Sequence, residues 1–533
     1  MVSDCGRDHH GGLSVLPARR VALTLLVALL LGGTTRTTVN TAAADFGAGR
    51  YAQALPGLRA QAAAGDVQAL LLLGRSASAG LGVSADHAQA AGFFRRAAEA
   101  GSAAAMAQLA GLYSAGRGVP QSDREAATWY LRAAEAGQTQ VMGQVGDLYA
   151  EGRGVSQDFS QAAHWYAAAA RAGQANAMYR LATLYADGRG VPPSPAEAAT
   201  WYLRAAQADH PAAMNSLGDA YREGLGVPRS DARASRWYLQ AARAGQVAAM
   251  RNIGFMFEAG RGVPRDERQA AAWYLKAGGA GEIRVMQDLG QRYELGQGLP
   301  ADAGQAAAWY GRAAQAGDRN AMNSLGDLYE SGRGVPQDDL QAAQWYRRAA
   351  LAGQVTAMKN LGFMYDYGRG LRHDPAAAAR WYRKAAQGGN ANAMNYLGDL
   401  FWAGRGLPQS HAQAVAWYRR AAEAGQITAV KNLAQAYEYG LGVPRDLERA
   451  ARLYRRSAWG GDINAMYSMG RLSRLGQGVA RSEAQATQWF LQAASAGHRE
   501  ARRELARRYD LGLGVARDPE QAQLWLGRAA RGE

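Results

Sequence analysis

The apolar residues of this chain recur with a period of 36 residues, thirteen times from Asp66 to Glu533 and without an insertion. In the unit 318–353 the first apolar set follows the spacing of one helix face, and it consists of Ala321, Met322, Leu325, Leu328 and Tyr329. A second apolar set predicts a second helix and consists of Ala342, Trp345, Tyr346, Ala349 and Ala350. We call these helix A and helix B. A fixed period of this length indicates a solenoid of stacked helix pairs.

Polar and glycine positions mark where these helices begin and end. Gly332 and Gly334 follow helix A, and glycine tolerates the positive φ that closes a helix. Asp338 precedes helix B, and its position is Asp or Ser in all 13 units, which predicts an N-cap worth ~1 kcal/mol. The position of Gly326 is Gly in nine units and Ala in four, so we expect a partner helix to approach closely there.

This pattern resembles the Sel-1-like repeat family, which is related to the tetratricopeptide repeats. The resemblance rests on Leu325-Gly326, Tyr329, Gly332-x-Gly334-Val335, Asp338, Trp345-Tyr346 and Ala349-Ala350, and it covers residues 66–533. It implies an all-α fold, a right-handed α-solenoid of 13 helix-turn-helix repeats of 36 residues, that acts mainly as a scaffold for protein–protein contacts. Some secreted relatives bind β-lactams and are disulfide-rich. This chain has one cysteine and departs from them.

The residues before the repeats predict export. Residues 1–44 combine Arg19-Arg20, the apolar run 21–31 and the small residues 42–44, which is typical of a secretory signal peptide. The alternative is that residues 21–31 are retained as an uncleaved anchor. Either general secretion or twin-arginine export could carry the protein. Removal of residues 1–44 would also remove Cys5 and exclude disulfides from the mature chain. Residues 45–65 predict a lone helix that caps the first repeat. The expected location is periplasmic or secreted if the source is bacterial.

The net charge of +15 allows an anionic partner. Lys or Arg stands three residues after the Trp position in ten units, where we expect it to complement the dipole of helix B. A further arginine stands between the loop glycines in seven units, and this loop arginine row consists of Arg117, Arg153, Arg189, Arg261, Arg333, Arg369 and Arg405. The row is either a solvated surface or a site for an anionic polysaccharide. Nucleic acid is not favoured, because no nucleic-acid motif is present.

Residue patterns for catalysis are missing from the sequence. The histidines form no i, i+4 pair, and the repeated Gly-x-Gly follows a helix in every unit, so it predicts a helix stop rather than a phosphate loop. A nucleophile elbow is likewise missing. We therefore expect a protein that is not an enzyme and has no cofactor or metal.

The variable positions of helix A indicate where a partner could bind. Core positions match between repeats, so specificity must come from the opposite face, which lines the concave groove in helical solenoids. In repeats 9 to 11 the candidate residues are Lys359, Phe363, Tyr367, Asp399, Trp402, Lys431, Gln435 and Tyr439. Trp402 is the expected exposed anchor. The leading hypothesis is an exported scaffold that binds protein partners in this groove. The alternatives are a binder of anionic or cell-wall glycan and, by distant resemblance, a β-lactam-binding or hydrolysing enzyme.

Overall fold

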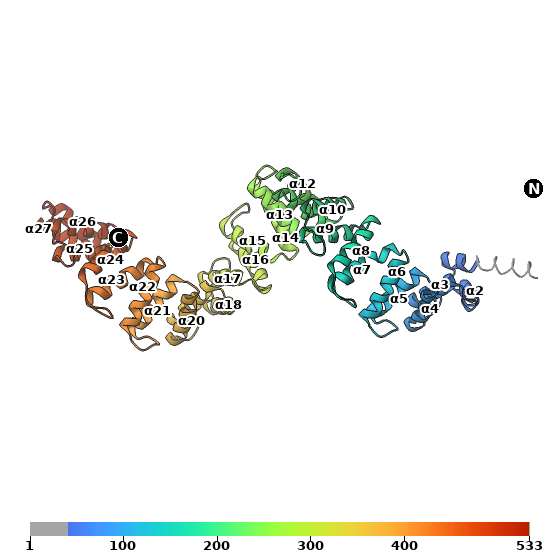
Figure 1. Ribbon diagram of the computed structural model, residues 1–533. Helices are drawn as coiled ribbons and strands as arrows, with labels where there is room; N and C mark the ends of the chain where they lie inside the picture. Colours follow the sequence, from blue (N-terminus) through green and yellow to red (C-terminus); the bar gives the residue numbers. More distant parts are fainter. Residues whose placement is uncertain (1–40, 532–533) are drawn as a thin grey trace, which may run out of the picture. The chain divides into compact units, whose positions relative to one another are not determined.

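A computed structural model describes residues 41–531, and all regular elements in this range are α-helices. The chain divides into two compact units, one up to Arg265 and one from Asp266. The division falls inside the sixth repeat, between its helix A and its helix B. Within each unit the helices follow one another in sequence order as stacked pairs (Figure 1).

In the unit up to Arg265, α2 (Tyr51–Ala63) precedes the repeats. The A helices are α3 (Val67–Ala79), α5 (Ala103–Ala115), α7 (Thr139–Glu151), α9 (Ala175–Asp187), α11 (Pro211–Glu223) and α13 (Val247–Ala259). The B helices are α4 (His87–Glu99), α6 (Asp123–Glu135), α8 (Phe159–Arg171), α10 (Pro195–Gln207) and α12 (Asp231–Arg243). Each A helix packs against the B helix of its own repeat and against the preceding B helix, where both lie in this unit.

The unit from Asp266 begins with a B helix, α14 (Glu267–Gly279). Its A helices are α15 (Ile283–Leu295), α17 (Arg319–Ser331), α19 (Val355–Tyr367), α21 (Ala391–Ala403), α23 (Ile427–Tyr439), α25 (Ile463–Leu475) and α27 (Arg499–Leu511). Its other B helices are α16 (Ala303–Gln315), α18 (Asp339–Leu351), α20 (Pro375–Gln387), α22 (His411–Glu423), α24 (Leu447–Trp459), α26 (Glu483–Ser495) and α28 (Pro519–Arg531). The prediction of an all-α solenoid of helix pairs is confirmed.

The helices begin and end at the capping and glycine residues that the sequence predicted. The backbone N–H of Gln341 donates to Oδ1 of Asp338 at 2.9 Å, which caps α18. Gly334 has φ 72°, and a Cβ added to it would lie 2.1 Å from the carbonyl group of Ala303 in the preceding B helix. The second loop glycine therefore serves packing between repeats as well as the turn, because a Cβ at this distance cannot be accommodated.

In the eighth repeat, only the tyrosine of the Trp-Tyr pair is a full core residue. Tyr346 is fully buried, whereas Trp345 is half-buried, so the prediction of Trp345 as a buried residue needs correction. The open face of its ring is covered by the guanidinium of Arg348, whose Cζ lies 4.8 Å from the ring centre. All eight repeats that combine Trp with Lys or Arg three residues later show this stacking. The cation therefore acts through a cation–π contact.

Two repeats lack the tryptophan but keep the cation, and they show what the cation does without a ring. Phe93 and Leu453 stand at the Trp position there. Arg96 donates to the carbonyl oxygen of Ala62, and Arg456 donates to that of Ala422, both at 3.1 Å. These carbonyls belong to the last turn of the preceding B-position helix, so the arginine ties neighbouring repeats together.

The N-terminal part of the described range packs onto α2. Residues 41–47 are helical, Ala42 is buried, and the Phe46 and Tyr51 rings meet at a centroid distance of 5.0 Å. The first 40 residues of the predicted signal peptide lie outside the described residues. The expected cleavage after Ala44 falls inside this helical segment and stays a prediction. No helix within residues 41–531 is long and apolar enough to cross a membrane.

Candidate partner-binding surface

Four of the eight candidate residues lie on α19 and α23 with accessible side chains. Tyr367 and Tyr439 are the last residues of these helices, and their exposed fractions are 57% and 54%. Gln435 is exposed, and the half-buried Phe363 ring lies 4.4 Å from the Tyr367 ring. The structure therefore brings an aromatic pair, Phe363 and Tyr367, to the surface of the ninth repeat.

The other four candidates are half-buried, as Phe363 is: Lys359, Asp399, Trp402 and Lys431. The expectation of an exposed Trp402 is wrong. Its ring packs against the rings of His411 at 4.6 Å and Tyr418 at 6.1 Å, both on α22 of the same repeat. The helical wheel placed Trp402 opposite the core, but helix B reaches around helix A far enough to cover this position.

Polar side chains link neighbouring A helices in alternate repeats. Asn360 of α19 donates to Oδ1 of Asn323 and to Oδ1 of Asp327 on α17, both at 3.2 Å. Asn432 of α23 makes the same two bonds to α21, at 3.0 Å to Asn395 and 3.2 Å to Asp399. The same asparagine and aspartate positions thus recur two repeats apart, and their hydrogen bonds fix α17 to α19 and α21 to α23.

The carboxylates in these links are held in a desolvated setting. The hydroxyl of Tyr346 donates to Oδ1 of Asp327 at 2.7 Å, and the hydroxyl of Tyr418 donates to Oδ1 of Asp399 at 2.8 Å. Burial raises the pKa of both carboxyl groups, and the bonds from the tyrosines oppose that rise. Because these carboxylates already accept hydrogen bonds from the protein itself, they stiffen the surface and have few acceptor positions left for a partner.

The residue type at the last position of helix A differs between the two units of the chain. In the unit from Asp266 this position carries large apolar side chains that are 48–57% exposed, and they form what we call the apolar stripe: Leu295, Tyr367, Tyr439, Leu475 and Leu511. Ser331 and Ala403 stand between its first three members. In the unit up to Arg265 the same position is small or acidic: Ala79, Ala115, Glu151, Asp187, Glu223 and Ala259.

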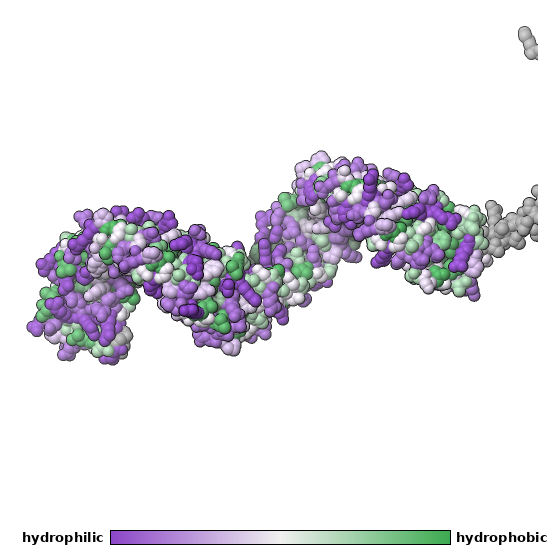
Figure 2. All heavy atoms as spheres, turned by 90° about the horizontal axis from the view of Figure 1, so that it is seen from below, coloured by the Kyte–Doolittle hydropathy of each residue, from purple (hydrophilic) through white to green (hydrophobic). Residues whose placement is uncertain are grey.

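The sequence interpretation found Tyr367 and Tyr439 but missed the three leucines of the stripe. A comparison of this one position across all repeats would have found them. On the face that Figure 2 shows, hydrophilic residues predominate and smaller groups of hydrophobic residues lie among them. Exposed apolar side chains that recur at one position are therefore a distinct feature of this surface.

Most of the loop arginine row is engaged within the protein. Arg405 donates to Asp366 of the preceding repeat at 3.0 Å, and Asp366 is itself 4% exposed. Ion pairs also hold Arg153 to Glu151, Arg261 to Asp231, Arg333 to Glu294, and Arg369 to Glu330 and Asp339. Arg189 lies 3.9 Å above the Phe159 ring, and Arg117 is exposed. These contacts reduce the charge that the row can offer to a polyanion.

Two histidines of the array cap helices. His210 and His498 occupy the N-caps of α11 and α27, where each Nδ1 accepts a backbone N–H, at 3.2 and 3.1 Å. Burial lowers the pKa of both imidazoles. Within residues 41–531 no three metal-binding side chains gather at one point.

A family model described as Sel1 repeat matches the chain thirteen times, at residues 67–102, 103–138, 141–174, 175–210, 211–246, 247–282, 284–318, 319–354, 355–390, 391–426, 428–462, 463–498 and 499–533. No curated protein matches the sequence. Among solved structures, the chain is similar to c5321, a protective antigen present in uropathogenic Escherichia coli strains that displays an SLR fold. The two are 32% identical, with a TM-score of 0.72, over 83% of this chain and 94% of that one. A Sel1 repeat protein from Oxalobacter formigenes is 31% identical over 58% of this chain and 90% of its own, with a TM-score of 0.48.

Proposed function

Because this chain belongs to the Sel1 repeat family, whose repeats generally form non-catalytic scaffolds for protein interaction, we propose that it binds a protein partner along the apolar stripe. Tyr367 and Tyr439 are the main anchors, and the Phe363 ring packs against the Tyr367 ring. Of the five remaining candidates, Gln435 is exposed and available to the partner, and Lys359, Asp399, Trp402 and Lys431 shape and stiffen the surface. We further propose that the protein is exported.

The single observation that carries this proposal is the contrast at the end of helix A. Large apolar side chains stay exposed there in one unit of the chain, while the same position in the other unit is small or acidic. Helix packing cannot account for the difference, because these side chains point away from the core. Exposed aromatic side chains carry much of the binding energy in protein interfaces, typically ~2 kcal/mol or more for an anchor.

The alternation of large and small residues along the stripe suggests how a partner would fit. Tyr367 lies between Ser331 and Ala403, and Ala403 is followed by Tyr439. Small residues between tyrosines leave space that side chains of a partner can enter. The alternative of an anionic glycan on the loop arginine row is less well supported, because six of its seven members contact groups of the protein itself.

The experiment places a photo-crosslinking amino acid, p-benzoylphenylalanine, at position 367 or 439 in cells that make the protein. The matched control carries it at Trp459, which is 76% exposed at the end of the B helix α24. We expect a specific crosslinked partner from positions 367 and 439 and none from position 459. The partner is then purified, and its affinity is measured for the double variant Tyr367→Ser/Tyr439→Ser.

The double variant should bind at least ten-fold more weakly, with its melting curve close to that of the wild type. Trp459→Ser should bind as the wild type does. Equal affinity of the double variant and the wild type would refute the stripe as the binding site. The anion-binding alternative would be favoured if salt and substitutions in the loop arginine row weaken binding of the partner while the double variant does not.

A further inference from the structure

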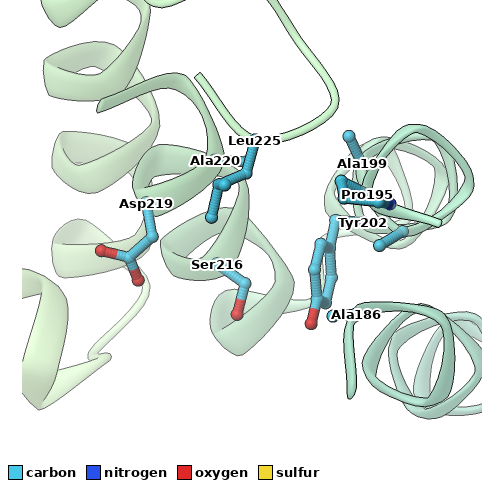
Figure 3. A pocket seen from close by; sticks show the side chains of 9 residues that line it. Ala186, Pro195, Ala199, Tyr202, Ser216, Asp219, Ala220 and Leu225 are labelled. Atoms are coloured by element: carbon cyan, nitrogen blue, oxygen red, sulfur yellow. The ribbon is translucent and has the colours of Figure 1, made fainter. Parts of the chain in front are cut away.

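A cavity of about 330 Å³ lies between the fourth and fifth repeats. It opens between α10 and α11, and its walls include Pro195, Ala199, Tyr202, Ser216, Ala220 and Leu225 (Figure 3). The walls are mostly apolar. Figure 3 shows the hydroxyl groups of Ser216 and Tyr202 at one end of the hollow and the side chains of Ala199 and Leu225 at the other. Cavities of this size bind small ligands or single side chains in many proteins.

The cavity exists because two small residues face each other across a repeat boundary. Ala199 of helix B and Ala220 of the next helix A both line it. The equivalent residues in the last two repeats are Thr487 and Arg508, and Nη1 of Arg508 donates to Oγ1 of Thr487 at 3.0 Å, so these two positions meet. The equivalent pairs can be compared wherever the helix A residue lies in the second repeat or later. Each pair apart from Ala199 and Ala220 has at least one member larger than Ala, and the larger members are Leu112, Leu148, Leu184, Met256, Arg292, Leu328, Met364, Leu400, Val415, Leu472 and Arg508.

A second local feature accompanies the hollow. In eight repeats a glycine of helix A receives an aromatic ring of helix B, as Gly326 receives Tyr346. The fourth repeat has Ala182 at this position, and its tyrosine, Tyr202, is only half-buried. The Tyr202 hydroxyl lies 3.5 Å from Oγ1 of Thr183, a weak contact that leaves capacity for another hydrogen bond.

The polar groups of the cavity favour an uncharged occupant. Asp219 also lines it, but Oδ1 of Asp219 accepts the hydroxyl of Tyr238 at 2.7 Å and pairs with Arg222 at 3.2 Å. Its charge is thus already compensated. What the hollow offers is an apolar wall of alanines, Pro195 and Leu225, with two hydroxyl groups at one end.

We propose that this cavity receives one aromatic side chain with a hydrogen-bonding tip, Tyr or Trp, from the protein partner. The ring would lie on the apolar wall, and the phenol or indole N–H would meet the hydroxyls of Ser216 and Tyr202. This inference rests on the proposed function, because it supplies a second contact for the same partner. It concerns the unit up to Arg265, whereas the apolar stripe belongs to the unit from Asp266.

The first experiment uses capped amino acids as probes and needs no partner. Binding of N-acetyl-tyrosinamide, N-acetyl-tryptophanamide, N-acetyl-phenylalaninamide and N-acetyl-lysinamide to the full chain is measured by saturation-transfer NMR. We expect the Tyr and Trp probes to bind best and the Lys probe to bind weakest. Ala220→Leu places in the cavity the residue that six of the twelve other repeats carry there. It should weaken binding of the Tyr and Trp probes at least ten-fold without lowering the melting temperature.

A second variant keeps the test decisive if Ala220→Leu perturbs packing. Tyr202→Phe/Ser216→Ala keeps the shape of the hollow and removes both hydroxyls, so the Tyr probe should lose its advantage over the Phe probe. Equal binding of the Tyr probe to wild type and Ala220→Leu, or a preference for the Lys probe, would overturn the site. If the probe binds but Ala220→Leu leaves the affinity for the purified partner unchanged, the assignment to the partner is refuted, while the stripe is judged by its own variants.

Discussion

Gly326→Ala should destabilise the eighth repeat, although alanine is the better helix former. The glycine lies inside α17, where the tyrosine ring of α18 rests against it. A Cβ at this position would lie 2.7 Å from both Cδ1 and Cε1 of Tyr346 and 3.2 Å from Cζ. Ordinary carbon contacts are ~3.5–4.0 Å. The ring must therefore move by most of an ångström.

The surroundings of Tyr346 resist such a movement. The side chain is fully buried, and its hydroxyl lies 2.7 Å from Oδ1 of Asp327 and 2.7 Å from Oε2 of Glu330. Overpacking of this kind costs ~1–3 kcal/mol, and the higher helix propensity of alanine returns ~1 kcal/mol. Strain in the tyrosine hydrogen bonds adds up to ~1 kcal/mol. The expected net loss of local stability is ~1–2 kcal/mol, a factor of ~5–30 in the opening equilibrium.

The assay is hydrogen exchange followed by mass spectrometry, because a repeat array opens locally and a single melting temperature would average over it. Peptides from α17 and α18 should exchange ~5–30 times faster in Gly326→Ala than in the wild type. Gly311→Ala is the matched control in the preceding B helix, where an added Cβ meets nothing within 4 Å. This control should slow exchange, because only the propensity gain of ~1 kcal/mol operates.

The result that would refute this reasoning is slower exchange in both variants. It would mean that the ring of Tyr346 yields without cost and that the glycine positions do not limit packing. Two other repeats carry alanine at this position with different results. In the fourth repeat Ala182 stands there and Tyr202 is half-buried in the wall of a cavity, whereas in the eleventh repeat Ala434 stands there and Tyr454 is 3% exposed.

Two further predictions concern the helix start at His210 and the predicted leader. Burial holds the pKa of His210 below its unfolded value of ~6.5, so the cap it gives to the N–H of Ala213 stabilises the fold above that pH and is lost as the pH falls through the folded pKa. His210→Asn gives α11 the cap that Asn390 gives α21. The hydrogen-exchange protection of α11 in this variant, relative to the wild type, should rise by up to ~1 kcal/mol as the pH falls below ~6.5. A ratio of variant to wild-type protection that does not change with pH would contradict this. Export with cleavage after Ala44 predicts an intact mass that begins at Asp45 in protein from the cell envelope, and a mass that begins at Met1 in the cytoplasm would contradict it.

The sequence by itself determined the helix pairs, their period and their ends. These features depend on short-range physics, since an Asp or Ser side chain caps amides two or three residues away and glycine closes a helix through its own φ. Asp338 and Gly334 could therefore be interpreted without knowledge of the fold. Repetition strengthened the inference, because thirteen copies of one pattern leave little room for another register.

Only the tertiary structure decided which side chains are left for a partner. The helical wheel of one helix cannot show how far a neighbouring helix covers it, and for this reason Trp402 was expected to be exposed and Trp345 to be buried. The cavity at Ala199 and Ala220 depends on which residues of consecutive repeats meet, a pairing that becomes visible only once helix B is packed against the next helix A. Spacing along the chain sets the faces of each helix, but contact between helices sets which part of each face remains exposed.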